Sequence, residues 1–167
     1  MLLLDPKFGE NKAKYIAQCA VVTLVMIVVL EILDAIADAA VIGALGASTF
    51  IAFTMPHARV SSPRFLVGGY AVGILAGVVC YYASVVVVAA GIPVLEDSSH
   101  VFFAALAVGS AIFVMVITNL EHPPAAGVAL GLVLNECHPL AILVVAVGIV
   151  LVAAMKTILK PILISLL

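Results

Sequence analysis

The feature that most constrains this chain is the length of its uncharged apolar segments. The segments 65–91, 101–120 and 139–155 contain no charged side chain. A helix needs about 20 mostly apolar residues to cross a hydrocarbon core of about 30 Å. Apolar residues make up 66% of the chain and charged residues 10%, a balance that excludes a water-soluble fold. We therefore expect an integral membrane protein.

The apolar pattern predicts an all-α polytopic membrane bundle of about five to six membrane segments, in a single transmembrane domain over residues 1–167. Residues 123–135 are short for a span, because they extend only about 20 Å as a helix. Either the preceding EHPP stretch lies inside the bilayer, or this piece is a re-entrant half-helix and the C-terminus lies outside. Charge placement favours six crossings. The predicted segments are 15–33, 39–55, 65–91, 101–120, 123–135 and 139–155.

Acidic and basic residues fall in separate connections. Basic residues accumulate in cytoplasmic loops, so we expect both termini and the connection 56–64 on the cytoplasmic side. The expected location is the inner or plasma membrane of a prokaryote. The basic residues are Lys7, Lys12, Lys14, Arg59, Arg64, Lys156 and Lys160, and the acidic turns carry Asp34, Asp38, Glu96, Asp97 and Glu136.

Glycines recur at intervals of four in two segments, at Gly69, Gly73 and Gly77 and again at Gly127 and Gly131. Lipid supplies no hydrophobic drive for helix association, and such stripes let helix backbones approach closely. The first stripe predicts either packing within the chain or a seam between subunits. The predicted helices are too few to enclose a wide pathway at the centre of one subunit. We therefore expect a homo-oligomer.

Two polar connections, 56–64 and 118–124, share a plan in which a histidine precedes a helix that opens with proline. This indicates a weak internal repeat, with copies at about 39–91 and about 101–156. Proline suits the first helical turn because the N–H that it lacks would be unpaired there. The structural motif residues are Pro56, Pro63, Gly68, Gly69, Pro123, Pro124 and Gly127.

The two helix starts suggest a binding site. A helix N-terminus combines free N–H groups with the positive end of the macrodipole, which suits an anion, and transporter folds bring such ends together around a substrate. We predict a small-anion site where the two connections meet, completed by the amides after Pro63 and Pro124. The candidate substrate-binding residues are His57, Ser61, Ser62, Arg64, Thr118, Asn119 and His122.

Simpler roles stay open for these residues. Arg59 suits a positive-inside topogenic role, and Arg64 can pair structurally with Glu121. The two serines before Pro63 can cap the helix that begins there. Both histidines can be ordinary loop residues.

The stretches PHARVSSPRFLVGGY (56–70) and EHPPAAG (121–127) resemble the HPP family of integral membrane proteins, which is named for its His-Pro-Pro motif. The resemblance extends from about Gly43 to the last span. Family members in chloroplasts and cyanobacteria are associated with nitrite transport, so the resemblance implies a nitrite-like substrate. The matching residues are Pro56, His57, Pro63, Arg64, Gly68 and Gly69 in the first motif, and His122, Pro123, Pro124, Ala125 and Gly127 in the second.

The chain departs from the family pattern at four positions. Ser62, Phe65 and Tyr70 stand where the family commonly has Gln, Asn and His. Glu121 stands where threonine usually precedes the His-Pro-Pro motif. By this comparison the chain loses neutral donors and gains a carboxylate beside the expected site.

These observations predict a membrane transporter of a small inorganic anion, nitrite-like. His57 or His122 would link transport to protons by titrating near neutrality. The alternatives are a transporter of another small organic anion, such as formate or a sulfonate, and a non-enzymatic binding or regulatory module.

An enzyme that uses His122 and Glu121 as an acid–base pair is disfavoured, because the sequence shows no convincing nucleophile, metal set or nucleotide loop. We expect no catalytic residue, metal, cofactor or nucleic-acid partner. The expected partners are the anion, the lipid bilayer and further copies of the chain. The three cysteines, Cys19, Cys80 and Cys137, are interpreted as small core residues.

Overall fold

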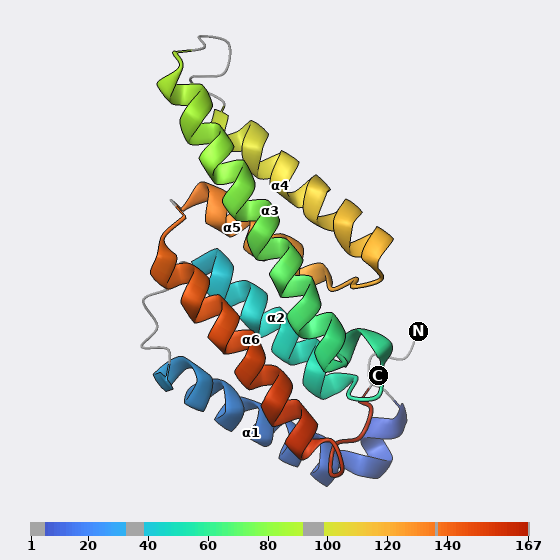
Figure 1. Cartoon of the computed structure of the whole chain (residues 1–167). Coiled ribbons are helices and arrows are strands. Elements are labelled where there is room, and N and C mark those ends of the chain that lie inside the picture. Colours follow the sequence, from blue (N-terminus) through green and yellow to red (C-terminus); the bar gives the residue numbers. More distant parts are fainter. Residues whose placement is uncertain (1–5, 33–38, 92–98, 136, 167) are drawn as a thin grey trace.

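Six helices make up the described part of the chain in the computed structural model, which covers residues 6–32, 39–91, 99–135 and 137–166 (Figure 1). Helices α3, α4 and α6 are each long and apolar enough to cross a membrane, and α2 and α5 are shorter apolar helices. The predicted all-α polytopic bundle is confirmed. The elements are α1 (Pro6–Ile32), α2 (Ala39–Thr54), the 3₁₀ turn η1 (Arg59–Ser61), α3 (Pro63–Ala89), α4 (Ser99–Thr118), α5 (Pro123–Leu134) and α6 (Pro139–Leu159).

Prolines set the starts of three helices. Pro63, Pro123 and Pro139 each lie in the first turn of their helix. The residue that precedes each proline has an extended backbone, as the proline ring requires. Connections of a few residues therefore place the end of one helix beside the start of the next.

The short helix α5 lies at the centre of the bundle, in contact with α2, α3 and α4 (Figure 1). Ala125, Val128 and Ala129 are fully buried on it. By contrast, α4 exposes a broad apolar face that includes Val101, Phe113 and Ile117. Such a face suits contact with lipid.

The glycine stripe of α3 packs against α5 of the same chain. A Cβ atom added at Gly69 would lie 2.5 Å from His122 Cβ, and one added at Gly77 would lie 3.0 Å from the Ala129 carbonyl oxygen. Gly73, between them, faces the Ala125 carbonyl. Of the two interpretations of this stripe, the structure supports packing within the chain. A homo-oligomer stays a prediction and would need another surface.

The helices alternate in direction along the chain. The contacts between α3 and α5 rise together in residue number, so these two helices run parallel, and α6 returns to the end of the bundle where α2 ends. There Leu166 N donates to Thr54 O at 2.8 Å. The first described turns of α1 and the C-terminal residues thus lie at one end of the bundle, and the choice between six crossings and a re-entrant 123–135 segment stays a prediction.

Gln18 of α1 holds that end together. Its side-chain amide donates to Phe53 O at 2.5 Å and to Ile164 O at 2.8 Å, and its carbonyl accepts from Ile164 N at 3.1 Å. The side chain is 5% exposed. A single buried glutamine thus satisfies backbone groups that would otherwise be unpaired at a helix end and in the C-terminal tail.

The cysteines occupy different environments. Cys80 and Cys137 are buried, in line with the expectation of small core residues, whereas Cys19 is exposed on α1. Burial raises the pKa of the Cys137 thiol, which lies between α5 and α6. The side chains of Lys7, Asp34, Asp38, Glu96, Asp97 and Glu136, on which the charge argument partly depends, lie outside the described residues.

Candidate functional site

The two polar connections meet, as the sequence predicts, and we call their contact the loop junction. It is formed by the 55–62 connection, which contains η1, and by residues 119–122. The Arg59 guanidinium donates to Asn119 Oδ1. Asn119 has a positive φ of 60°, a conformation that asparagine tolerates better than most residues. This backbone turn brings the carboxamide to Arg59.

Two motif glycines allow the close approach. A Cβ atom at Gly68 would lie 2.8 Å from Leu120 Cδ2, and one at Gly69 would lie 3.1 Å from the Leu120 carbonyl oxygen. Gly127, by contrast, leaves ordinary contact space, because a Cβ there would lie 3.8 Å from Ala44 Cβ. The glycine pair of the first motif therefore packs directly on the chain that leads into the His-Pro-Pro motif.

The positive charge at the loop junction has neutral partners. Besides Asn119, Arg59 lies over the Phe65 ring, with its Cζ atom 4.9 Å from the ring centroid. Within the described ranges, neither Arg59 nor Arg64 forms an ion pair, and Glu121 forms none either. The structural pairing of Arg64 with Glu121 that the sequence left open is absent from this part of the chain. Arg59 therefore has no acidic partner among the described residues, and its side chain, like that of Asn119, is exposed.

The other predicted residues spread over the surface and the interior. His57, Arg64 and Thr118 are exposed, whereas Ser61 is fully buried. The hydroxyls of Ser61 and Thr118 donate to nearby backbone carbonyls, those of Ala58 at 2.8 Å and Val114 at 2.6 Å. Ser62 occupies the N-cap position of α3 without a side-chain capping bond. The seven residues thus do not form one cluster.

The helix starts offer fewer free amides than expected. Pro123 and Pro124 have no N–H, and Ala125 N, the amide after Pro124, donates to His122 O at 2.9 Å. At α3 the amides of Phe65 and Leu66 both donate to Ser62 O at 3.0 Å. The prediction that the amide after Pro124 is a free donor is wrong, because the proline-started turn already uses it.

His122 lies in a buried polar cluster with Ser48 of α2 and Tyr70 of α3. Ser48 Oγ lies 2.8 Å from His122 Nε2 and 2.8 Å from the Tyr70 hydroxyl. The exposed fractions of the three side chains are 0%, 0% and 1% for Ser48, His122 and Tyr70. Tyr70 lies seven residues into α3, which puts the cluster about 10 Å inside the end of the bundle.

The second ring nitrogen of His122 is less well satisfied. Nδ1 is buried and forms no hydrogen bond of ordinary geometry in the described structure. The Val60 backbone lies beside the ring as a hydrogen-bond acceptor of poorer geometry. Val60 is the chain neighbour of Arg59. The ring therefore bonds α2 through one nitrogen and approaches the loop junction with its other side.

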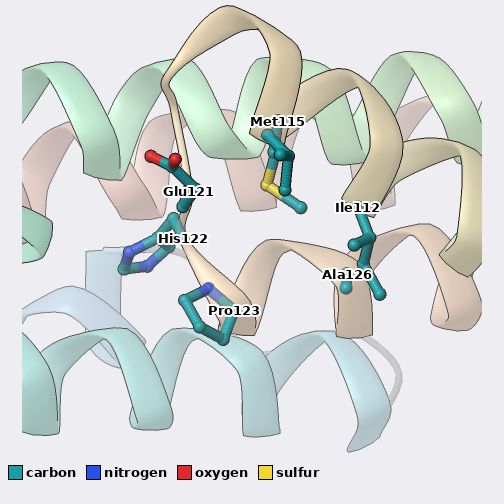
Figure 2. A pocket seen from close by; sticks show the side chains of 7 residues that line it. Ile112, Met115, Glu121, His122, Pro123 and Ala126 are labelled. Carbon is teal, nitrogen blue, oxygen red and sulfur yellow. The ribbon is translucent and has the colours of Figure 1, made fainter.

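An apolar pocket of about 260 Å³ adjoins the His-Pro-Pro motif between α4 and α5. In Figure 2, Glu121 and His122 lie at one end of it and Ile112 and Ala126 at the other, with Met115 between them. Ile112 is 48% exposed, so the pocket opens toward the apolar face of α4. Its lining suits hydrocarbon better than an ion.

Sequence reasoning left three residues of this site out of the candidate binding set. The sequence places Arg59 and Arg64 as positive charges beside the site but favours a topogenic role for Arg59, and it gives Ser48 and Tyr70 no site role. The available signal for Ser48 and Tyr70 was a hydroxyl in each of two apolar helices, since a polar group buried among helices needs a partner. Tyr70 stands where the family commonly has histidine, and its hydroxyl supplies a neutral donor at that position.

Comparison with known proteins finds a family whose model matches the chain. A family model described as HPP, transmembrane region, matches residues 9–164, nearly the whole chain. No curated protein and no solved structure matches the chain.

Proposed function

Since this chain belongs to the HPP family of transmembrane proteins, we propose that it transports a small inorganic anion, nitrite-like, across the membrane. The anion binds at the loop junction, beside Arg59 and Asn119. The N-terminus and the loop junction face the cytoplasm of a prokaryotic cell in this proposal. The chain acts as a transporter and not as an enzyme.

The observation that carries the proposal is the charge of Arg59, which has no acidic partner among the described residues. Its contacts are a carboxamide oxygen and an aromatic ring, both neutral. The contact with Asn119 uses part of the guanidinium, which has five N–H donors in a planar fork. The remaining donors are available to an anion, because the Arg59 side chain is exposed.

Guanidinium geometry also narrows the substrate class. Two parallel N–H groups match an anion with two oxygens on one atom, because each oxygen accepts one bond. Nitrite and formate both have this shape. A sulfonate also offers paired oxygens but is bulkier. The substrate class is therefore a small oxyanion, with nitrite as the first choice and formate as the nearest alternative.

Flux into proteoliposomes tests the proposal. Purified protein is reconstituted, and uptake of nitrite, nitrate, formate and methanesulfonate is compared with uptake by protein-free liposomes. We expect saturable uptake of nitrite above the other anions. Saturable uptake of formate or methanesulfonate in place of nitrite would keep the transporter and change its substrate. Absence of uptake for all four anions would refute transport and favour a binding or regulatory module.

The two arginines provide matched variants. Arg59→Gln removes the charge at the loop junction, whereas Arg64→Gln removes the charge of the second residue of α3. Both arginine side chains are exposed. Loss of a charged hydrogen bond weakens binding by about 1.5–3 kcal/mol, so we expect Arg59→Gln to raise the half-saturating nitrite concentration by about tenfold or more. Arg64→Gln should have a smaller effect. A larger effect of Arg64→Gln would assign the anion contact to Arg64, as the sequence predicted.

A further inference from the structure

The hydrogen bonds around Ser48 restrict where the hydrogens of the buried cluster lie. Ser48, Tyr70 and neutral His122 together have three polar hydrogens, but only two hydrogen bonds join them. Ser48 Oγ forms no other hydrogen bond in the described structure, and the Tyr70 hydroxyl forms none besides the one with Ser48. Each possible arrangement can therefore be counted by the groups that it leaves unpaired.

One arrangement leaves the fewest unpaired groups. If Tyr70 donates to Ser48 and Ser48 donates to His122 Nε2, both hydroxyl hydrogens are used and the ring hydrogen lies on Nδ1. If the ring instead donates from Nε2, either the Tyr70 hydrogen or the Ser48 hydrogen has no acceptor, and Nδ1 has no donor. Buried polar groups without partners are unfavourable. The geometry thus selects the tautomer with hydrogen on Nδ1.

That hydrogen is itself a buried donor with no partner of ordinary geometry in the described part of the chain. It lies on the ring nitrogen that Ser48 leaves free, where the Val60 backbone acts as a hydrogen-bond acceptor of poorer geometry. Arg59, beside Val60, has no acidic partner among the described residues. The His122 ring is 0% exposed, whereas Arg59 and Asn119 are exposed, so this N–H group faces the backbone of the loop junction from the inside.

We propose that Ser48 and Tyr70 are positioning residues that hold His122 as its neutral Nδ1–H tautomer, so that the ring presents its N–H group to the Val60 backbone and holds the loop junction in the form that binds the anion. The inference rests on the proposed transport function for the identity of the ligand. The tautomer itself follows from the hydrogen-bond geometry alone. The buried hydroxyls thus act on the site through His122.

Nitrogen NMR of protein labelled with [¹⁵N]histidine measures the tautomer in the full chain. The chain has four histidines, and His122→Gln identifies the signals of His122. Two-bond couplings to the ring hydrogens distinguish Nδ1 from Nε2. We expect hydrogen on Nδ1 in the wild-type protein. We also expect the ¹⁵N chemical shift of that nitrogen to change when nitrite is added. Hydrogen on Nε2, or a doubly protonated ring, overturns the inference.

Ser48→Ala and Tyr70→Phe test the positioning role. Ser48→Ala removes the donor to Nε2, and we expect the Nδ1–H population to fall and nitrite affinity to drop about five- to tenfold, as for one lost hydrogen bond. Tyr70→Phe should give a smaller change in the same direction. Ser84→Ala is the matched control, because Ser84 is also fully buried but donates to Tyr81 O of its own helix.

The outcomes separate this inference from the proposed function. An unchanged His122 tautomer in Ser48→Ala overturns the positioning role even if the variant transports poorly, because a merely structural defect would not preserve the spectrum. Wild-type protein with hydrogen on Nδ1 but no anion uptake and no response to nitrite refutes the anion site. The same loss of affinity in Ser84→Ala would also contradict the inference.

Discussion

Gly69→Ala is expected to displace the His-Pro-Pro motif from its partners. The added methyl group would lie 2.5 Å from His122 Cβ and 3.1 Å from the Leu120 carbonyl oxygen. Carbon atoms pack at about 3.5–4.0 Å, so α5 must move by about 1 Å or more. If His122 moves away from α2, the 2.8 Å contact between Nε2 and Ser48 Oγ stretches beyond hydrogen-bonding distance.

The energetic terms have different signs. Overpacking destabilises by about 1–3 kcal/mol, and loss of a hydrogen bond between membrane helices adds about 0.6 kcal/mol. Alanine is a better helix former than glycine by about 1 kcal/mol, which offsets part of this. The free energy of unfolding should therefore fall by a net of about 0.6–2.6 kcal/mol.

Titration with sodium dodecyl sulfate in mixed micelles, followed by circular dichroism, measures the free energy of unfolding of each variant. Gly109→Ala is the control, because a Cβ atom at Gly109 would meet nothing within 4 Å, and this variant should be as stable as wild type or more stable. Equal stabilities for Gly69→Ala and Gly109→Ala would refute the close packing of α3 on the His-Pro-Pro motif.

Three further predictions concern stability and packing. Gln18→Leu removes three hydrogen bonds and should lower the free energy of unfolding by about 2–3 kcal/mol, measured in the same titration. Thr23→Val, which removes only a bond within α1, should have almost no effect. Asn119→Ala should be less stable than Asn119→Gly by about 1 kcal/mol, because alanine disfavours the positive φ at this position. N-Ethylmaleimide should label Cys19 in native micelles, whereas the two buried cysteines should react only after denaturation, as mass spectrometry would show.

The positions of the helices were predictable because local chemistry sets them. Uncharged segments gave the spans, and Pro63, Pro123 and Pro139 gave three helix starts. The largest difference is α1, which begins at Pro6, before the predicted span, and has a non-helical backbone at Asn11. The first turns of α1 contain lysines, so they fall outside a segment that is predicted from uncharged length alone. The division into two repeats stays a prediction.

The site was predictable only in part because its contacts depend on lateral helix packing. The two connections were correctly expected to meet, since their motifs share a plan. Which arginine reaches Asn119 depends on the 3₁₀ turn at Arg59–Ser61, and the sequence contains no clear signal for that turn. Ser48 and His122 are separated by 74 residues, and only the packing of α2 on α5 brings them together.

Side-chain NMR of the two arginines tests the central claim most directly. Arg59 and Arg64 are the arginines of the chain, so [¹⁵N]arginine labelling gives one guanidinium signal set for each, and Arg64→Lys assigns them. Nitrite is titrated into the micellar protein at constant ionic strength. Our account predicts a saturable displacement of the Arg59 signals and little change for Arg64. Arg59 signals that stay in place, or that move only in proportion to a general salt effect shared with Arg64, would contradict it.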